Sequence, residues 1–288
     1  MMELTSPAKI NLFLDVTARR SNGYHEIATV FLPVEKLGEK GVLTELDEDG
    51  VEIVCEHPSV PCDERNLCHK AAVLFAEEAK VVARWKILIE KNIPVAGGMG
   101  GGSSDAAAVL RLLNQKYSNK VTAERLAEIA LEIGADVPYF LDPVAAKAEG
   151  LGEELLSIKA PKLQLLLITF DFPIAAAWAY QNRDQVYNRA ERSLFEVEAC
   201  LEAGDLKGIA GCVYNDLAIA CREKFPVLKM ACDDLLKVGA LASEVSGSGP
   251  TVFGLFESSE AAEEAKVELL ESKLYAEEAL KVCSTIGS

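Results

Sequence analysis

PVAGGMGGGSSDAA, residues 94–107, has an unusual composition for a stretch between two regular elements. Five of the six positions from 97 to 102 are glycine, the residue that loses the most backbone freedom on folding. The apolar run at 85–94 predicts a strand that stops at Pro94, and the alanine- and leucine-rich run at 103–117 predicts a helix. The chain therefore passes from a strand through a glycine-rich turn into a helix.

This order predicts an anion site at the start of the helix. The first N–H groups of a helix have no partner within it and lie at the positive end of its dipole. A glycine turn lets further N–H groups converge on a phosphate without a Cβ in the way. We expect Ser103 and Ser104 to cap the helix and to offer hydroxyls to the phosphate or to a metal ion bound to it. The residues assigned to a bound polyphosphate are Pro94, Val95, Ala96, Gly97, Gly98, Met99, Gly100, Gly101, Gly102, Ser103 and Ser104.

A tight turn of purely structural meaning is the alternative. The stretch matches neither G-x-x-x-x-G-K-[ST], because Gly102 is followed by Ser103, nor G-x-G-x-x-G in any register. The number of glycines and the double serine at the helix start favour the phosphate site.

The charge balance argues against some partners. Lys and Arg number 29 against 45 Asp and Glu, a net charge of −16 over 288 residues, so a basic face for nucleic acid is not expected. No apolar run approaches the roughly 20 residues of a membrane span. The N-terminus lacks the basic and apolar regions of a signal peptide. A cytoplasmic location without membrane association is therefore expected.

Several potential metal ligands gather early in the chain: Cys55, His57, Cys62, Cys68 and His69. Their spacing is not that of paired C-x-x-C ligands. Cys68 also belongs to an apolar helix pattern with Ala72 and Phe75. Free thiols are therefore favoured over a metal site for this group and for the eight cysteines as a whole.

Hydrophobic periodicity divides the rest of the chain into strands and helices. Strands are expected at 8–18, 27–34, 51–56, 85–94, 163–170 and 245–256 and near the end of the chain. Helices are expected at 66–80, 103–117, 122–133 and 258–272 and across most of 175–231, with Thr122 as a cap and Gly134 just past a helix end. This order predicts an α+β protein with antiparallel sheets and two lobes, residues 1–155 and 156–288.

Two features outside the glycine-rich stretch support a phosphate site. Lys9, the first basic residue, lies in an apolar strand and is either a lysine at a sheet edge or a cation beside the phosphate. SGSG at 246–249 is a second glycine–serine turn next to an apolar strand. It is either a plain hairpin or a second part of the site.

These motifs together resemble a known family. PVAGGMGGGSSDAA looks like the phosphate loop of the GHMP small-molecule kinases, and SGSGPTVF at 246–253 resembles their C-terminal glycine motif. SPAKINLFLDVTARRSNGYHE at 6–26, GADVPYF at 134–140 and AAKAEGLGE at 145–153 are similar to the branch whose substrate is 4-diphosphocytidyl-2-C-methyl-D-erythritol. The motifs follow the family's order across residues 6–256.

The resemblance implies a two-lobed GHMP kinase fold, with an N-terminal lobe like ribosomal protein S5 and a ferredoxin-like C-terminal lobe. It implies transfer of the γ-phosphoryl group of ATP, with Mg2+ on the nucleotide, to the 2-hydroxyl of that substrate in the non-mevalonate route to isoprenoids. The expected partners are ATP and the small molecule (cytidine diphosphate methylerythritol). The expected state is a monomer or a weak homodimer.

The resemblance also implies catalytic roles. Lys9 is expected to stabilise charge on the transferred phosphoryl group, and Asp136 to take or orient the proton of the acceptor hydroxyl. Ser104 is the candidate contact to the nucleotide-bound magnesium. The alternative for Asp136 is a helix cap, because Asp-Val-Pro is a typical helix start. The glutamate that helps to hold magnesium in related kinases has no counterpart that we can place.

On the substrate side, the resemblance implies that Asn11, Tyr24 and His25 line the site. Tyr24 and His25 would hold the cytosine, and Tyr180 would cover the other face of the base. An ordinary turn with a packed tyrosine is the alternative for residues 23–26. Residues 175–177 are all alanine where this branch often has Ser or Thr, so a hydroxyl contact from that segment is not expected.

Asn215 and Asp216 match a family position to which no role is assigned. Two other functions remain as alternatives: another GHMP kinase, of the mevalonate or homoserine type, and a nucleotide-binding relative without catalysis. The presence of both Lys9 and Asp136 argues against the second, and the GYH sequence at 23–25 argues against a mevalonate substrate.

Overall fold

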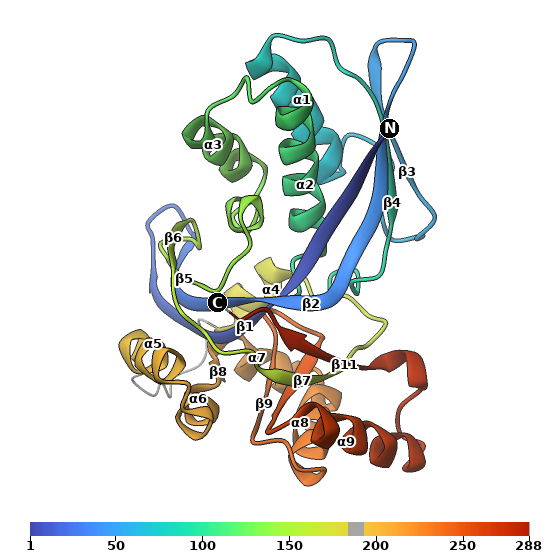
Figure 1. Cartoon of the computed structure of the whole chain (residues 1–288). Helices are drawn as coiled ribbons and strands as arrows, with labels where there is room; N and C mark the ends of the chain where they lie inside the picture. The colour runs from blue at the N-terminus through green and yellow to red at the C-terminus, as the bar shows by residue number, and fades with distance from the viewer. Residues whose placement is uncertain (184–192, 288) are drawn as a thin grey trace. The chain divides into compact units, whose positions relative to one another are not determined.

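The structure is a computed structural model that describes residues 1–183 and 193–287 (Figure 1). It contains two compact units that alternate along the chain. Unit 1 comprises Met1–Ala8, Leu37–Val95 and Gly100–Pro143, and unit 2 comprises Lys9–Lys36, Ala96–Met99 and Val144–Ser288. Because the units alternate, they do not follow the expected boundary between residues 155 and 156, and a lobe division there stays a prediction.

Unit 1 has a short sheet centred on β4 (Arg84–Glu90). The C-terminal part of β2 (His25–Glu45) pairs with β4 in antiparallel fashion, and β3 (Gly50–Cys55) pairs with it in parallel. Alternate residues of β4 are buried, as expected for a strand with one apolar face. The helical segments are α1 (Leu67–Ala79), α2 (Gly101–Lys116), α3 (Ala123–Ile133) and the 3-10 helix η1 (Pro138–Leu141).

The helices of unit 1 pack on one another and on the sheet. α1 contacts both α2 and α3, and these three helices lie together in Figure 1. Phe75 of α1 meets the ring of Trp85 of β4 in an edge-to-face contact with centroids 6.4 Å apart. Both side chains are fully buried, so α1 and β4 share one apolar core.

Unit 2 is built on an antiparallel sheet in the order β2, β11, β7, β10, β9. Its strands besides β2 are β7 (Gln164–Ile168), β9 (Ala242–Val245), β10 (Val252–Phe256) and β11 (Leu280–Thr285). β5 (Ala146–Glu149) also pairs with β2, and β6 (Glu154–Ser157) pairs with β5. β8 (Tyr214–Asn215) pairs in parallel with β1 (Met2–Arg19).

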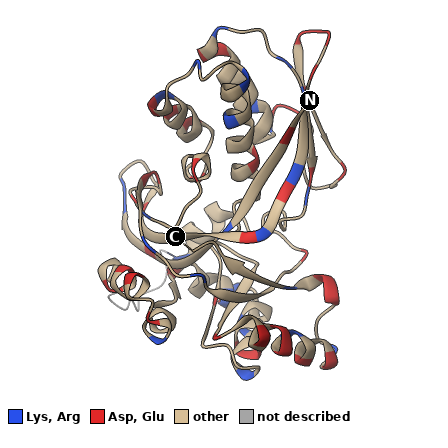
Figure 2. Ribbon diagram, in the orientation of Figure 1, with Lys and Arg blue, Asp and Glu red and all other residues tan. Residues whose placement is uncertain are grey.

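The α-helices of unit 2 are α4 (Ala176–Arg183), α5 (Leu194–Ala203), α6 (Leu206–Cys212), α7 (Asp216–Lys224), α8 (Pro226–Lys237) and α9 (Ser259–Glu271), with the 3-10 helix η2 (Glu277–Ala279). α8 packs on β9 and β10, and α9 packs on β7, β10 and β11. Figure 2 shows acidic residues recurring along α9. This is the pattern of a helix with one apolar face on the sheet and one face in solvent.

Most of the expected elements are confirmed. α3 begins after Thr122, whose side chain accepts a hydrogen bond from the N–H of Arg125, and it ends at Gly134. The expectation of wholly antiparallel sheets is wrong, because β3 with β4 and β1 with β8 pair in parallel. Residues 245–256 form the end of one strand, a turn and a second strand rather than a single strand. Hydrophobic alternation cannot reveal strand direction or partners, which explains both errors. In the part of the chain that the structure describes, no helix combines the length and apolar character needed to cross a bilayer.

Candidate active site

The glycine-rich loop leads from β4 into α2. α2 begins at Gly101, and Gly100 occupies the cap position with a φ of 75° and no side-chain cap. The expectation that Ser103 and Ser104 cap the helix is therefore wrong, since both lie inside its first turn. The left-handed backbone of Gly100 turns the chain into the helix without a side-chain oxygen. The first N–H groups of α2 thus keep the free donors that an anion needs.

Ser104 is fully buried, and among the described residues its Oγ has no hydrogen-bond partner. A buried hydroxyl without a partner is unfavourable by about 1–3 kcal/mol. Its backbone N–H donates to the carbonyl of Gly100 at 2.9 Å, so the residue is fixed in the first turn. The hydroxyl is therefore suited to an incoming phosphate oxygen or to a metal ion carried by it.

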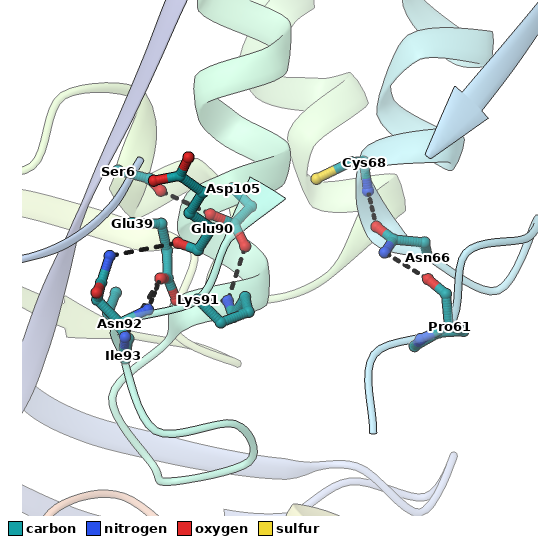
Figure 3. Close-up of polar contacts among 10 residues, drawn as sticks. All are labelled: Ser6, Glu39, Pro61, Asn66, Cys68, Glu90, Lys91, Asn92, Ile93 and Asp105. Atoms are coloured by element: carbon teal, nitrogen blue, oxygen red, sulfur yellow. Dashed lines mark hydrogen bonds and ion pairs between the residues drawn. The ribbon is translucent and has the colours of Figure 1, made fainter. Parts of the chain in front are cut away.

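Residues that come just before and just after this loop in the sequence meet in a buried charged cluster in unit 1 (Figure 3). The ammonium of Lys91, just before the loop, contacts Glu39 at 2.5 Å and Asp105 of α2 at 2.9 Å. Ser6 donates to the other carboxylate oxygen of Asp105 at 2.6 Å. Glu39 also accepts hydrogen bonds from the backbone N–H groups of Asn92 and, at 3.2 Å, Ile93. The cluster ties the segment before the loop to the helix after it.

The cluster holds two carboxylates against one ammonium in a buried place. Burial raises the pKa of Glu39 and of Asp105 above the ordinary values of 4.5 and 3.8, although Lys91 acts in the opposite direction. Burial alone would lower the pKa of Lys91, but the two carboxylates outweigh it and raise that pKa above 10.5. The folded protein therefore binds protons here more tightly than the unfolded chain does.

Lys9 of β1, the candidate catalytic cation, lies in unit 2. Its side chain is almost fully buried, and its ammonium donates to Asn11 Oδ1 at 2.5 Å and to the carbonyl oxygen of Gly98 at 3.1 Å. The ammonium also lies 5.3 Å from the ring centre of Phe31. The backbone N–H of Lys9 donates to the carbonyl of Met99 at 3.0 Å. Lys9 is thus a buried cation attached to the middle of the glycine-rich loop, not a lysine at an exposed edge.

The middle of the loop packs directly on the SGSG turn. Ser246 Oγ donates to the Gly98 carbonyl at 3.0 Å and accepts from the N–H of Asn11 at 3.3 Å. The N–H of Thr251 donates to the carbonyl of Gly97 at 3.3 Å. A Cβ at Gly98 would lie 2.0 Å from the carbonyl oxygen of Ser246, so only glycine allows this approach. SGSG is therefore the turn between β9 and β10 and also packs on the glycine-rich loop, while a part in phosphate binding stays a prediction.

The loop also contains a residue in an unfavourable conformation. Ala96 has a φ of 53°, in the left-handed region that residues with a Cβ rarely adopt. This conformation costs about 1–2 kcal/mol and persists only where the surroundings impose it. Pro94 and Val95 precede it and complete the link to β4.

The substrate-side candidates also lie in unit 2. The rings of His25 and Tyr180 stack with centroids 5.2 Å apart and planes 19° apart. Asn11 donates from Nδ2 to Thr29 Oγ1 at 2.9 Å, which fixes its Oδ1 toward Lys9. Tyr24 is 62% exposed, next to His25 at the start of β2. The structure brings His25 and Tyr180 together and places Asn11 on Lys9, while Tyr24 points largely into solvent.

Asp136 lies in unit 1, before η1. The 3-10 helix begins at Pro138 with Val137, not Asp136, in the cap position. Burial and, to a lesser extent, the charge of Asp136 raise the pKa of Tyr139. Lys9 and Asp136 belong to different units, and their approach to one another stays a prediction.

Sequence reasoning missed Glu39, Lys91 and Ser246 as parts of the site. Lys91 and Glu39 carried no motif, and only their positions next to apolar strands hinted at buried charges. Ser246 lay in a motif that was singled out, but its contact with Gly98 joins positions 148 residues apart. Among the described residues, no group of three or more His, Cys, Asp or Glu side chains is placed to hold a metal ion.

Comparison with known proteins gives a consistent family. The model for the GHMP kinases N terminal domain matches residues 66–142, and that for the GHMP kinases C terminal domain matches residues 197–276. The 4-diphosphocytidyl-2-C-methyl-D-erythritol kinase of Chloroherpeton thalassium is 38% identical over 258 residues, 88% of this chain and 89% of that protein. The kinase of the same name from Geobacter metallireducens is 37% identical over 262 residues, 91% of each.

Solved structures agree. A crystal structure of 4-(cytidine 5'-diphospho)-2C-methyl-D-erythritol kinase matches with a TM-score of 0.83 at 30% identity, over 100% of both chains. Homoserine kinase from Cytophaga hutchinsonii matches with a TM-score of 0.73 over 99% of this chain and 94% of that one, but at 18% identity it shows the fold alone. The fold is that of the GHMP kinases, which are ATP-dependent enzymes. This chain belongs to the GHMP kinases, within the family of the 4-diphosphocytidyl-2-C-methyl-D-erythritol kinases.

Proposed function

We propose that this protein transfers the γ-phosphoryl group of ATP to the 2-hydroxyl of 4-diphosphocytidyl-2-C-methyl-D-erythritol. One observation carries the proposal beyond the family. The buried ammonium of Lys9 donates one hydrogen bond to the carbonyl of Gly98, in the proposed phosphate loop. It donates another to Asn11, on the proposed substrate side. A fixed cation between these two groups is suited to a reaction that moves negative charge from one to the other.

The transfer needs positioning and charge stabilisation more than covalent help. The substrate's 2-oxygen would form a bond to the γ-phosphorus while the bond to the β–γ bridging oxygen breaks and ADP leaves. The proton of the hydroxyl would pass to Asp136, or Asp136 would orient that hydroxyl. The N–H groups at the start of α2 and the ammonium of Lys9 would neutralise the phosphate charge, so that residues 94–104 form the ATP site.

His25 and Tyr180 would bind the cytosine. Their rings contact one another, so a base that enters between them would exchange one ring–ring contact for two ring–base contacts. The exposed phenol of Tyr24 lies on the same segment as His25 and would close over the base when substrate is bound. This arrangement would select a flat heterocycle, which mevalonate and homoserine lack.

Magnesium would be held mainly by the nucleotide. Mg2+ commonly keeps waters and binds through substrate phosphates with one or two protein oxygens. The buried Ser104 hydroxyl without a partner among the described residues fits such a contact. Bound there, the ion would neutralise charge on the β- and γ-phosphates. The two lobes, residues 1–155 and 156–288, would provide the phosphate loop with Asp136 and the SGSG turn with Tyr180, respectively.

ADP release measured with purified protein, ATP and Mg2+ tests the function. We expect release only when the cytidyl substrate is added, with mevalonate and homoserine inactive. Turnover of mevalonate or homoserine without turnover of the cytidyl compound would assign the protein to another kinase of the family. ATP binding without turnover of any of the three would point to the non-catalytic alternative.

A further inference from the structure

Asn215 and Asp216 match a family position that the proposed function leaves without a role. Asn215 ends β8 and Asp216 begins α7, so a strand passes directly into a helix. Their side chains are buried, with residue exposures of 0% and 1%. A buried amide and a buried carboxylate are unfavourable unless bonded, so their partners show what they hold in place.

Asn215 holds the SGSG turn. Its Nδ2 donates to the carbonyl oxygens of Val245 at 2.8 Å and Gly247 at 2.7 Å, and its Oδ1 accepts from the N–H of Leu217 at 2.9 Å. The amide therefore bonds to the backbone on both sides of Ser246 while capping α7. The two N–H groups and the oxygen that make these three hydrogen bonds belong to one planar side-chain amide.

The held turn is the one that contacts the phosphate loop. Ser246 donates to the carbonyl of Gly98, the same oxygen that receives the ammonium of Lys9. A Cβ at Gly247 would lie 3.1 Å from that oxygen and 3.3 Å from Asn11 Oδ1. Asn215 thus holds the SGSG turn, and Ser246 of that turn shares the Gly98 carbonyl with Lys9. Asn215 therefore acts on the nucleotide side of the site indirectly.

Asp216 holds a different element. Its Oδ2 accepts from Arg183 Nε at 2.6 Å and Nη2 at 2.5 Å and from the N–H of Val16 at 3.3 Å, and its Oδ1 accepts from the Tyr214 hydroxyl at 3.0 Å. Arg183 is the last residue of α4, and α4 packs against α7.

Arg183 and Tyr180 share one side of α4. Residues three apart in a helix lie on the same face, so the anchor at Arg183 orients the ring of Tyr180. That ring stacks on His25, the proposed partner of the cytosine. The bond between Asp216 and Arg183 therefore fixes the rotation and position of the helix that carries one wall of the base site.

We infer that Asn215 and Asp216 are positioning residues that serve different substrates: Asn215 orders the phosphate loop for ATP, and Asp216 orders α4 for the cytidyl group. This inference rests on the proposed function. The inference is distinctive because it assigns two adjacent residues separate effects on the binding of two substrates. A merely structural role would impair both substrates together or would lower stability alone.

The test compares KM for ATP and KM for the cytidyl substrate in four variants. Asp216→Asn and Arg183→Lys are expected to raise KM for the cytidyl substrate by about tenfold, the effect of weakening one charge-assisted hydrogen bond. Their KM for ATP should stay within about twofold, which is the scatter of an unaffected site. Ser246→Ala and Asn215→Ser should show the opposite split, with KM for ATP raised about tenfold.

Tyr214→Phe is the matched control. It removes one hydrogen bond to Asp216 and keeps the ring beside Phe13, while the bonds from Arg183 remain. Both KM values should match the wild type. If Asn215→Ser does not fold, Ser246→Ala still tests the turn, and Arg183→Lys serves the same purpose for Asp216.

Calorimetric binding of cytidine diphosphate gives a readout independent of turnover. The wild type and Ser246→Ala should bind it alike, and Arg183→Lys should bind it about tenfold more weakly. Equal changes in both KM values across all variants, or none, would overturn the inference while the wild type still turns over the cytidyl substrate. Absence of that turnover in the wild type would instead overturn the proposed function.

Discussion

Gly98→Ala tests whether the glycine-rich loop owes its composition to packing as well as to phosphate. Gly98 has a φ of 76°, and a Cβ there would lie 2.0 Å from the carbonyl oxygen of Ser246 and 2.9 Å from the nitrogen of Gly249. Both are backbone atoms of the SGSG turn, so they cannot move aside as the end of a flexible side chain does. The substitution should separate the loop from the turn.

The size of the effect follows from the contacts at this position. Alanine in the left-handed region is less stable than in ordinary conformations by about 1–2 kcal/mol. Relief of the clash needs a shift of about 1.5 Å to reach a normal contact distance of about 3.5 Å. That shift breaks the bond from Ser246 to the Gly98 carbonyl and weakens the bond from Lys9, each worth about 1 kcal/mol. We expect the free energy of unfolding to fall by about 2–4 kcal/mol, and Tm by about 3–7 °C for a chain of 288 residues.

Gly102→Ala is the control within the same loop. The nearest atom to a Cβ at this position is Leu67 Cδ1 at 3.8 Å, an ordinary contact, and the residue is helical. Alanine should stabilise the helix by about 0.5–1 kcal/mol. Thermal unfolding and calorimetric ATP binding should be measured on both variants. A Gly98→Ala protein with the Tm and ATP affinity of the wild type would refute the packing argument. A normal Tm with lost ATP affinity in Gly102→Ala would show that phosphate approaches that Cα.

Three further predictions concern other parts of the site. Lys9→Met and Asp136→Asn should each lower kcat by about 10²-fold or more. Asp136→Asn should also leave the equilibrium affinity for ATP unchanged. An unaltered kcat in either variant would remove the substituted residue from the mechanism. Tyr180→Ala should raise KM for the cytidyl substrate at least tenfold, since stacking of a base on an aromatic ring is worth about 1–3 kcal/mol. Tyr180→Phe keeps the ring and should match the wild type. Equal KM values in both variants would argue against base stacking. Glu39→Gln should change the pH dependence of stability: the pKa of Glu39 is raised on folding, so its contribution to stability is greatest below about pH 4.5 and falls as pH rises through the raised pKa. The free energy of unfolding of the glutamine variant, relative to the wild type, should therefore increase as pH rises from about 4.5 through the raised pKa, and a constant difference would contradict this assignment.

Local features of the site were readable from the sequence because each depends on neighbours in the chain. The glycine-rich turn between a strand and a helix follows from composition and periodicity over residues 85–117. Thr122 as a helix cap depends on residues three positions apart. Lys9 stood out because a charge in an apolar strand has to find a partner. The resemblance to a family then joined these separate signals into one site.

The cap of α2 shows where local reasoning failed. Ser103 and Ser104 have a hydroxyl that can cap a helix, and the glycines before them have no side chain to do so. The helix nevertheless begins at Gly101, since Gly100 adopts a left-handed conformation that sharply reverses the chain. Residue preference at a cap is a matter of about 1 kcal/mol, which tertiary contacts readily outweigh. Here the surroundings of Gly101 are close: a Cβ at this position would lie within 3.4 Å of side-chain atoms of Lys91, Glu39 and Ile93.

Contacts between distant segments could not be predicted from one sequence. The hydrogen bond from Ser246 to Gly98 and that from Ser6 to Asp105 join residues about 150 and 100 positions apart. No periodicity links such pairs, and their residue types are common. Asp105 in particular was given no role from the sequence. Only its burial against Lys91 shows that it belongs to the support of the loop.

These supports bear on how a chain with a net charge of −16 would bind the two polyanions of the proposed reaction. A surface of this charge repels ATP at long range, and screening by salt limits that repulsion to about 10 Å. Binding must therefore come from donors that are aimed at the phosphates at close range. Backbone N–H groups carry no net charge and can be concentrated only if glycines let the chain fold tightly and other groups hold it so. Asn215, Ser246 and the Glu39–Lys91–Asp105 cluster supply that restraint, which leaves Lys9 as the cation at the centre of the loop.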